Sequence, residues 1–580
     1  MKKALSLTLL MLIPMATLGS GAAGAASVPA PAGTGGAVAS ADPLATAAGL
    51  AILRGGGNAV DAAVATALVL AVVYPEAGNL GGGGFALVRM GGELQALDFR
   101  ETAPARAKPD MYLDSQGKPV ENASLVGPLA AGVPGSPAGL WELQRRFGRL
   151  PWPKVVEPAR RLAADGFTVG RYLHEGLSGG ESHKLLLKFP ETVKMWLPNN
   201  RGENGGEPPA VGSILRQPDL AATLGRYAER GPQGIVTGAV AEAVEKASSA
   251  HGGVLTAADL AAYKPVWRTP LTAEAFGWKL ASMPLPSSGG VIVGQTLGML
   301  EKLGWEKLPR FSADRDHLLA EVFRRSFADR FLLGDPATSK ATEAQLLDPA
   351  WIARRAAEID PRHATASAQV QHWPGAAAAA AVPGSSETTH LSVVDRDGNL
   401  VALTTTLNGL YGCGLWVPGA GFFLNNEMDD FATAPGLPNL FGLIQGEANA
   451  VGAGKRMLSS MTPVIAWKGD EAYALGGRGG SRIPSHTIEV LLNAIVDHDP
   501  LQAALDRPRL HHQWLPDRLE AEADALAPET RAELERRGHT LHITTTTAKV
   551  HAVHRLPGGR VEAGSDPRGS GMGAVVDPDP

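Results

Sequence analysis

The chain has 580 residues, a formal net charge of −5 and 19% charged side chains. Positive and negative side chains are intermixed, which argues against the basic surface that nucleic acids or membrane surfaces attract. A single cysteine, Cys413, excludes an intramolecular disulfide. Stability must therefore come from a large hydrophobic core, which a chain of this length can form.

The N-terminus has the features of a secretory signal peptide. Lys2 and Lys3 precede an apolar run, residues 4–18, and small residues follow up to Ser27. The apolar run is short for a transmembrane helix, and no other stretch is long and apolar enough to cross a bilayer. The sequence therefore predicts a signal peptide over residues 1–26 and an exported protein, periplasmic or secreted.

An apolar helix is the first predicted element, over residues 59–73, with Asn58 as its N-cap and Asp61 as its only charge. Because this helix is apolar on every face, we expect it to lie buried between two layers. Four glycines, residues 81–84, come next and lead into a hairpin that ends at Phe99. No Lys-Ser or Lys-Thr pair follows them, so close backbone packing explains them better than a phosphate-binding loop.

The middle of the chain is predicted to be mainly helical, with helices at 136–147, 152–165, 220–230, 239–250, 257–263 and 317–333. The polar segment 178–212, with Gly, Asn and Pro toward its end, is predicted to be a loop. Residues 373–386, WPGAAAAAAVPGSS, are of low complexity and predict a mobile linker directly before Thr388. An ordinary linker between domains would have the same composition.

A β-hairpin is predicted after this linker. Residues 391–395 alternate, Asp397-Gly398 is a tight-turn signal, and residues 400–407 are rich in Leu, Val and Thr. Pairing across the turn would bring Thr388, at the open start of the hairpin, close to Thr406, near its open end.

Thr388 is a candidate nucleophile because a break of the Glu387–Thr388 bond would make it an N-terminal residue. Its own α-amine would then act as a general base beside its hydroxyl. A threonine in a hairpin is more often an ordinary strand former, which remains the better interpretation of Thr404 and Thr405. For Thr388 the choice between a nucleophile and an ordinary strand former depends on the motifs in the rest of the chain.

Two further features point to a small-molecule site. Carboxylates and amides cluster at residues 425–430, which suits recognition of a charged ligand, and the turn-rich segment 434–441 is a candidate surface lid. Strands are predicted at 462–467 and 472–475. Gly479-Gly480 precedes a predicted helix at 484–496 and would present backbone N–H groups to an oxyanion. Taken alone, this glycine pair fits a plain turn equally well.

Five motifs together resemble those of the γ-glutamyltranspeptidase family: LDFRETAPA, TTHLSVVDRDGN, NNEMDDF, KRMLSSM and GRGGSR. The resemblance extends from about Gly35 to Arg568 and so covers nearly the whole mature chain. It implies the α+β fold of the N-terminal nucleophile hydrolases, a four-layer αββα sandwich in which helices cover two stacked sheets.

The resemblance also implies a precursor that cuts itself between Glu387 and Thr388. The products would be a large subunit, residues 27–387, and a small subunit, residues 388–580, which stay together as a heterodimer. In this family pattern, Thr388 is the nucleophile, a second threonine supports its hydroxyl, and two glycine amides form the oxyanion hole. The implied catalytic residues are Thr388, Thr406, Gly479 and Gly480.

The implied reaction moves a γ-glutamyl group from glutathione or another γ-glutamyl amide to water, an amino acid or a dipeptide. Arg100 would grip the substrate α-carboxylate, since a guanidinium fork suits bidentate binding. Ser459 and Ser460 would be its further carboxylate-binding partners. The substrate α-amino group would be held by Asn408, Glu427 and Asp430. The family pattern requires no cofactor and no metal, and adjacent histidines at 511–512 point to opposite faces of a strand.

Two departures from the family pattern stand out. Phe441 occupies a lid position that is often Tyr, and residues 409–414 differ from a threonine-rich version. Cys413, within that segment, is expected to be a small buried residue. One alternative is an acylase for glutaryl or cephalosporin-type side chains, which needs no amine clamp, so Glu427 and Asp430 argue against it. Another is an exported γ-glutamyl-peptide binding protein that never matures, against which the intact hairpin argues.

Overall fold

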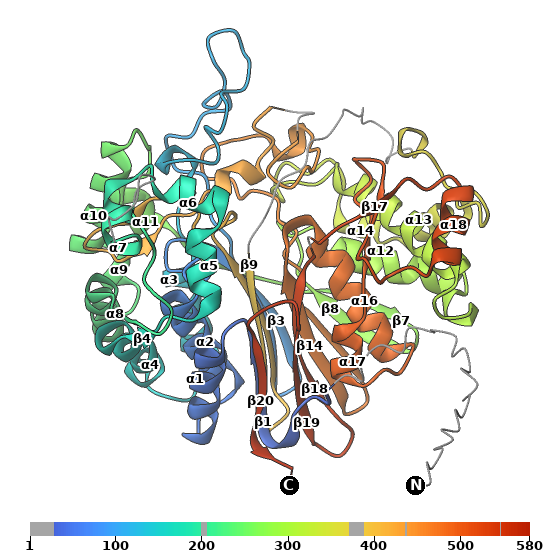
Figure 1. Ribbon diagram of the computed structural model, residues 1–580, viewed down its shortest axis with the longest axis horizontal. Coiled ribbons are helices and arrows are strands. Elements are labelled where there is room, and N and C mark those ends of the chain that lie inside the picture. Colours follow the sequence, from blue (N-terminus) through green and yellow to red (C-terminus); the bar gives the residue numbers. More distant parts are fainter. Residues whose placement is uncertain (1–27, 199–205, 371–387, 435–437, 546, 580) are drawn as a thin grey trace, which may run out of the picture.

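The computed structural model describes residues 28–198, 206–370, 388–434, 438–545 and 547–579. Two β-sheets lie face to face in the centre, and helices cover both outer faces (Figure 1). This arrangement confirms the predicted αββα sandwich. The predicted signal peptide, the linker at 373–386 and the Glu387–Thr388 bond lie outside the described residues.

The two central sheets are halves of one 13-stranded hydrogen-bonded path that folds over at β1. One half runs in the order β6-β3-β2-β10-β9-β1, the other in the order β19-β18-β14-β13-β8-β7, and β20 also pairs with β1. The strands are β1 (Ala32–Ser40), β2 (Gly83–Met90), β3 (Glu93–Phe99), β6 (Val266–Arg268), β7 (Leu271–Ala275), β8 (Trp278–Ser282), β9 (Thr388–Asp395), β10 (Leu400–Thr406), β13 (Val464–Lys468), β14 (Glu471–Arg478), β18 (Lys549–Arg555), β19 (Val561–Ser565) and β20 (Met572–Pro578).

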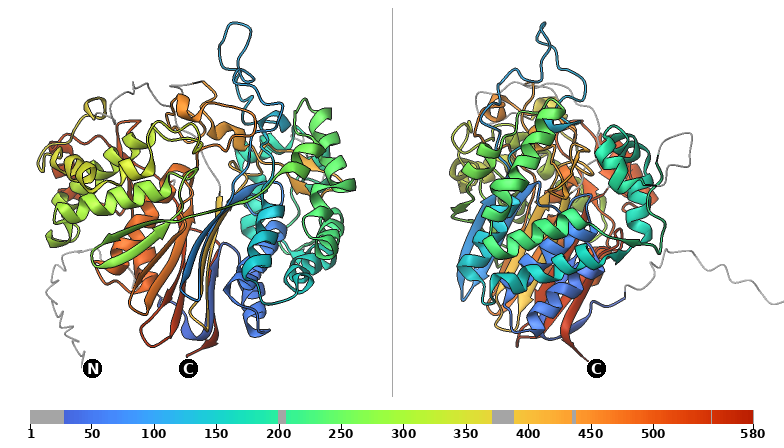
Figure 2. Two further views of the ribbon diagram at one scale, coloured as in Figure 1. Left: turned by 180° about the vertical axis from the view of Figure 1, so that it is seen from behind. Right: turned by 90° about the vertical axis from the view of Figure 1, so that its left-hand side faces the viewer.

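One helical layer lies against the β9–β10 half (Figure 1, blue to green). It comprises α1 (Pro43–Arg54), α2 (Ala59–Val73), α3 (Ser136–Phe147), α4 (Trp152–Asp165), α5 (Arg171–Ser178), α6 (Gly180–Leu186), α7 (Pro190–Trp196), α8 (Pro218–Arg230), α9 (Gln233–Val236), α10 (Gly238–Ala250) and α11 (Ala257–Ala262). Helices of the other layer lie against the β14 half (Figure 2). They are α12 (Gly289–Lys302), α13 (Ala313–Arg330), α14 (Glu343–Leu346), α15 (Pro349–Ala357), α16 (Ile483–Ile495), α17 (Leu501–Asp506) and α18 (Pro528–Arg536).

Short elements complete the fold. Small sheets pair β4 (Phe167–Thr168) with β5 (Ile214–Leu215), β11 (Trp416–Val417) with β12 (Phe422–Phe423), and β15 (Leu510–His511) with β16 (Leu519–Ala521) and β17 (Leu541–Ile543). Two 3-10 turns, η4 (Glu427–Asp430) and η6 (Gly480–Arg482), carry candidate site residues. No helix in the described ranges has the length and apolar character that a membrane span requires.

The apolar helix α2 is buried between the sheet and other helices, as predicted. All of its residues are buried, and it contacts β9 and β10 on one side and α1, α3 and α4 on the others. Asn58 caps it by accepting hydrogen bonds from the amides of Val60 and Asp61, and the Asp61 carboxylate accepts one from the Asn58 amide. A helix with no polar face is stable here because it is enclosed on every side.

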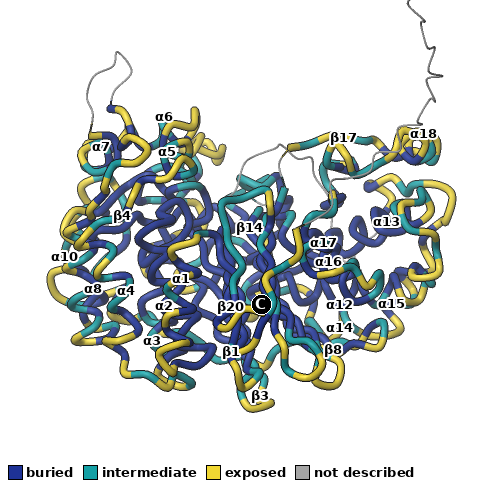
Figure 3. Tube along the Cα trace, turned by 60° about the horizontal axis from the view of Figure 1, so that its bottom comes forward, coloured by how far each residue is buried: buried dark blue, intermediate teal, exposed yellow. Residues whose placement is uncertain are grey.

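Side chains from both halves of the sheet pack together, and every residue of β9 and β10 is buried. Coloured by burial, the chain shows its exposed residues mainly on the outer helices and the loops (Figure 3). Where β9 crosses β14, the ring of His390 lies against Gly476, and a Cβ on Gly476 would approach that ring to 2.4 Å. Glycine at this position therefore lets the two halves of the sheet approach closely. This close contact fixes β14 relative to the strand that begins with Thr388.

The prediction of a loop over residues 178–212 is wrong for its first half. Helices α6 and α7 occupy most of residues 180–196. Each is only seven residues long, so its few inward-facing residues do not make a visible period. Leu186 and Trp196 are fully buried, and Trp196 stacks on Phe423 with ring centroids 5.6 Å apart. Helix α12 was also not predicted, because its four glycines weaken the helical signal.

Candidate active site

Thr388 and Thr406 are paired directly across the β9–β10 ladder. The Thr388 hydroxyl lies 3.5 Å from the Thr406 hydroxyl, and Thr388 is buried. The Thr406 oxygen also accepts a hydrogen bond of 2.7 Å from the amide of Asn408. The predicted proximity of the two threonines is confirmed, and it follows from the register that the Asp397-Gly398 turn imposes.

The glycine run is packed against this hairpin. A Cβ on Gly82 would lie 2.1 Å from the carbonyl oxygen of Thr406, and one on Gly84 would lie 2.2 Å from that of Thr404. The interpretation of these glycines as close-packing residues is confirmed. Asn79, which the sequence did not single out, ties the two segments together because its Nδ2 donates to the Thr406 carbonyl at 2.8 Å.

Arg100 follows strand β3 and reaches the carboxylates of η4. Its Nη2 lies 2.5 Å from Asp430 Oδ2, and its Nη1 forms an ion pair with Glu427. All three side chains are buried. Although burial acts against the charged form, these carboxylates raise the pKa of Arg100 above its usual value. The predicted carboxylate-binding arginine is therefore paired with two predicted amine-binding carboxylates.

Glu101 adds a third carboxyl group to this cluster. Its oxygens have no hydrogen-bond partner within the described residues, and Oε2 lies 3.6 Å from Arg100 Nη1. Burial raises the pKa of Glu101 to about 7, and burial also raises the pKa values of Glu427 and Asp430. Three carboxyl groups thus lie around the Arg100 guanidinium, which makes the cluster favourable for an added cation. Glu101 was not predicted as a site residue. Its position directly after Arg100 in the sequence was the signal that could have identified it.

Ser459 and Ser460 form the next part of the site. The Ser460 hydroxyl is buried and has no hydrogen-bond partner within the described residues, and the same holds for Glu427 Oε2. Ser459 Oγ accepts a hydrogen bond of 3.1 Å from the amide of Met461. A buried donor and a buried acceptor without partners are costly unless a ligand or water pairs with them.

Nine of the ten predicted site residues line one cavity. Its lining residues are Arg100, Thr388, Thr406, Asn408, Glu427, Asp430, Phe441, Ser459, Ser460, Met461, Gly480 and Ile483. The open space is about 10 Å³, which is enough for one water at most. Phe441, from the predicted lid, is one of the walls, whereas lid residues 435–437 lie outside the described residues. Met461 and Ile483 were not predicted.

The tenth predicted residue, Gly479, is not part of this lining but directly precedes Gly480. Gly479 has φ 136° and Gly480 has φ 57°, both in the region that favours glycine. A Cβ on Gly479 would lie 2.6 Å from the Cα of Ala548. Arg478, the residue before the pair, is buried and donates hydrogen bonds to Glu76 at 2.9 Å and Tyr172 at 2.6 Å. The glycine turn therefore begins directly after a residue whose side chain is held in place by hydrogen bonds.

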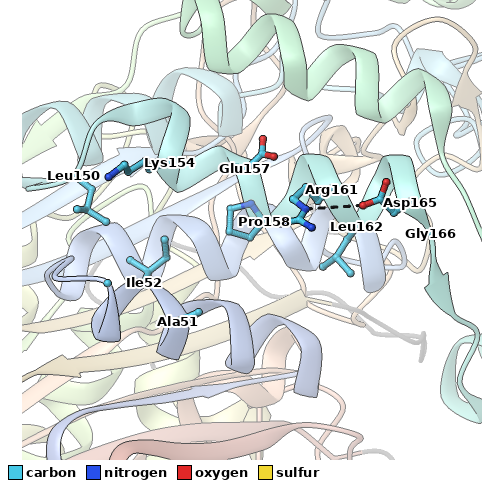
Figure 4. Close-up of a pocket in the computed structure, with 11 residues that line it drawn as sticks. Ala51, Ile52, Leu150, Lys154, Glu157, Pro158, Arg161, Leu162, Asp165 and Gly166 are labelled. Carbon is cyan, nitrogen blue, oxygen red and sulfur yellow. Dashed lines mark ion pairs between the residues drawn. The ribbon is translucent and has the colours of Figure 1, made fainter.

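A wider surface groove lies elsewhere, between helices α1 and α4 (Figure 4). It encloses about 670 Å³ and has an apolar floor that includes Ile52, Leu150 and Leu162. Lys154 and the Arg161–Asp165 ion pair lie among its lining residues (Figure 4). None of the predicted site residues lines this groove, so its larger volume does not make it the candidate active site.

The remaining residues considered from sequence are structural. Burial raises the pKa of the Cys413 thiol to about 12, so this cysteine is a buried thiol, as predicted. His390 is hydrogen-bonded to the hydroxyls of Thr404 and Ser392. Within the described ranges, His, Cys, Asp and Glu side chains do not form a group of three or more that would suit a metal ion.

Stacked sheets with helices on both outer faces define the class of N-terminal nucleophile hydrolases. The family model described as Gamma-glutamyltranspeptidase matches residues 45–576, and the chain therefore belongs to the γ-glutamyltranspeptidase family.

Relatives cover nearly the whole chain. A protein of Pseudomonas aeruginosa named glutathione hydrolase proenzyme is 44% identical over 553 residues, which are 94% of this chain and 95% of that relative. A protein of Escherichia coli K12 with the same name is 42% identical over 536 residues, with 92% and 90% covered. The crystal structure of cephalosporin acylase from Bacillus halodurans has a TM-score of 0.80 at 25% identity, over 98% of this chain and 99% of that one.

Proposed function

We propose that this chain is a γ-glutamyltransferase and glutathione hydrolase that matures by cutting its own Glu387–Thr388 bond. The signal peptide, residues 1–26, is removed on export to the periplasm or the medium. The large subunit, residues 27–387, and the small subunit, residues 388–580, then remain associated. Cleavage exposes the α-amine of Thr388, which serves as the general base for its own hydroxyl.

Substrate binding exchanges the partners of Arg100. The substrate α-carboxylate forms an ion pair with the Arg100 guanidinium, and the unpaired Ser460 hydroxyl and Ser459 are further donors to it. The substrate ammonium takes the places that the guanidinium leaves beside Glu427 and Asp430. One zwitterionic head group thus replaces one internal ion-pair set, so that Arg100, Glu427 and Asp430 each keep a partner of opposite charge.

The chemistry has two steps. Thr388 Oγ attacks the γ-carbonyl carbon and its proton passes to the Thr388 α-amine. The carbonyl oxygen becomes an oxyanion beside the Gly479 and Gly480 amides, each of which is worth about 3 kcal/mol of barrier. The C–N bond then breaks, and the leaving amine takes the proton. Water, or the amine of an amino acid or dipeptide, attacks the γ-glutamyl ester and regenerates the threonine.

The observation that carries this proposal is that one cavity is lined by the Thr388 hydroxyl, the Arg100 guanidinium and the carboxylates of Glu427 and Asp430. Mass spectrometry of active protein should find a fragment that begins with TTHLS. Turnover of a γ-glutamyl anilide should accompany it, and glycylglycine should increase the rate if transfer to a dipeptide competes with hydrolysis.

Thr388→Ala should abolish both cleavage and turnover. Thr388→Ser is the matched control, because it keeps a hydroxyl at the same atom and should retain both at reduced rates. If the alanine variant still matures into two chains, or if the unbroken chain is fully active, the assignment of Thr388 is wrong. A single full-length band after long incubation, without turnover, would favour the alternative of an exported γ-glutamyl-peptide binding protein that never matures.

The close structural likeness to a cephalosporin acylase supports a second candidate, an acylase for glutaryl-type side chains. Such a substrate carries a carboxylate but no amine, so it would add negative charge beside Glu101, Glu427 and Asp430. A proton would have to balance the added charge of this substrate, and the raised pKa values of the three buried carboxyl groups favour its uptake. A higher kcat/KM for a glutaryl anilide than for the γ-glutamyl anilide would establish the acylase instead.

A further inference from the structure

Arg330 is a buried guanidinium beside the candidate site that the proposed mechanism does not yet use. It is the last residue of α13 and is 2% exposed. Its Nε donates a hydrogen bond of 3.0 Å to Ser288 Oγ. Unlike Arg100, it forms no ion pair within 4 Å of a carboxylate in the described residues. A buried cation in this state needs a long-range partner or an absent ligand.

Ser288 connects Arg330 to the carboxylate-binding serines. The Ser288 hydroxyl donates to the carbonyl oxygen of Ser459 at 2.8 Å, and the Ser288 amide donates to the same oxygen at 2.8 Å. Arg330 therefore lies at the back of the segment that carries Ser459 and Ser460. The Arg330 guanidinium is thus linked to the backbone of this segment through the hydroxyl of one serine.

The charge of Arg330 acts on Asp430. Burial lowers the pKa of Arg330 to about 10, and Asp430 offsets part of this effect. In return, Arg330 is the second cation, after Arg100, that favours the ionised form of Asp430. The charged and titratable groups around Asp430 are Arg100 and Glu101 after β3, Arg330 on α13, and Glu427 and Asp429 in η4.

The partner exchange proposed above makes this second cation important. When Arg100 turns to the substrate carboxylate, Asp430 keeps Arg330 as its remaining protein cation. The charge of Arg330 favours the ionised form of Asp430, which is the form that can hold the substrate ammonium. Without it, Arg100 would face three carboxyl groups alone, and Asp430 would take up a proton more readily.

We propose that Arg330 is a positioning residue that determines specificity for the zwitterionic γ-glutamyl head group. It keeps Asp430 charged, and through Ser288 it holds the Ser459 backbone in place, while Arg100 binds the substrate carboxylate. This inference rests on the proposed γ-glutamyl activity. It assigns the choice between an amino-acid head group and a plain carboxylate to a residue that lies outside the cavity lining.

The test compares Arg330→Gln, which removes the charge, with Arg330→Lys, which keeps it. Processed wild type and variants are assayed from about pH 5 to pH 9 with γ-glutamyl and glutaryl anilides. In Arg330→Gln we expect the γ-glutamyl to glutaryl ratio of kcat/KM to fall roughly 10-fold, mainly through KM. The acidic limb of the γ-glutamyl profile should move up by about one pH unit, because loss of a nearby cation raises the Asp430 pKa. Arg330→Lys should keep the ratio within about 3-fold of wild type.

A purely structural role predicts a different pattern. Equal losses on both substrates, with an unshifted pH profile in either variant, would overturn the proposal, and so would an unchanged ratio in Arg330→Gln. If Arg330→Gln fails to fold, Arg330→Lys decides alone: a preserved ratio and acidic limb support the proposal, and a ratio changed more than 10-fold overturns it. Failure of the proposed function is seen separately, because wild type would then lack the TTHLS fragment or γ-glutamyl turnover.

Discussion

Thr406 faces Thr388 across the β9–β10 ladder, and its hydroxyl accepts hydrogen bonds from Thr388 at 3.5 Å and from the Asn408 amide at 2.7 Å. Asn408 itself has φ 74°, a strained value for a non-glycine residue. The contact therefore links the candidate nucleophile to a strained turn whose side chain lines the same cavity.

Thr406→Val tests this relationship because valine keeps the β-branched shape and removes only the hydroxyl. We expect kcat to fall roughly 10- to 100-fold, the value of one hydrogen bond to a reacting group, with KM nearly unchanged. Self-cleavage should slow in parallel. Thr406→Ser keeps the hydroxyl and should stay within a few-fold of wild type. Equal rates for the two variants would show that this hydroxyl has no part in the reaction.

Gly82→Ala tests the close packing under the hairpin. The new methyl group would lie 2.1 Å from the Thr406 carbonyl oxygen, a backbone atom that cannot move without breaking the ladder. We expect a loss of about 3 kcal/mol of stability and poor maturation, measured by thermal unfolding and by the yield of cleaved subunits. Gly91→Ala is the control, since its methyl group meets nothing within 4 Å and should cost only about 1 kcal/mol. Equal costs at both positions would rule out the packing explanation.

Local sequence signals were sufficient where the structure depends on neighbours in the chain. The Asp397-Gly398 turn predicted the hairpin and its register, and Asn58 with the apolar run after it predicted α2. Helices α6 and α7 were missed because each is short and buries few residues, so tertiary contacts rather than local periodicity stabilise them.

The site as a group was not predictable from local patterns. Arg100, Glu427 and Ser459 are hundreds of residues apart or on different elements, and only the family resemblance placed them together. The resemblance assigned Arg100 to the substrate and Glu427 to its amine, but the direct ion pair between them came from the structure. Arg330 carried no signal, because its role depends on where α13 ends relative to η4.

The pH dependence of γ-glutamyl turnover should follow the buried carboxyl groups. Burial raises the pKa of Glu101 to about 7 and raises those of Glu427 and Asp430 as well. A carboxyl group with a raised pKa is neutral below that value and cannot pair with the substrate ammonium. We therefore expect kcat/KM to rise with pH over a range above that of an ordinary carboxyl group, as free-enzyme ionisations control this constant.

Glu101→Gln should move this acidic limb to lower pH, because the negative charge of Glu101 raises the pKa of Glu427. Glu121→Gln, at an exposed position, is the control and should leave the limb in place. A limb that moves to higher pH in Glu101→Gln would contradict the assignment of these carboxyl groups to the ammonium site.

Asp430→Asn tests whether the charge of Asp430 binds the substrate ammonium. Loss of the charge should lower kcat/KM for a γ-glutamyl anilide roughly 100-fold. Turnover of a glutaryl anilide should hold or improve, because Arg100 is released for the carboxylate. Asp429→Asn is the matched control, since Asp429 accepts a hydrogen bond from Ser124 at 2.6 Å and does not pair with Arg100. Parallel losses on both substrates in Asp430→Asn would mean that Asp430 serves the fold rather than recognition.

Arg478 and Glu76 form a buried ion pair at 2.9 Å, with 4% and 2% of each residue exposed, immediately before the Gly479-Gly480 turn. Arg478→Met would leave the Glu76 carboxylate buried without its cation, at a cost of about 3 to 5 kcal/mol. The double variant Arg478→Met with Glu76→Gln removes both charges and should recover a large part of this loss, so the two substitutions should not be additive in thermal unfolding.

The same variants report on the oxyanion hole. If the ion pair fixes the start of the turn, kcat should remain depressed in the double variant even where stability recovers, because the glycine amides lose their anchor while the γ-glutamyl pocket is untouched. KM should change little for the same reason. A double variant that regains both stability and kcat would show that the ion pair contributes to the fold alone. Stability losses of the two single variants that add within about 0.5 kcal/mol would show that the two side chains are not coupled.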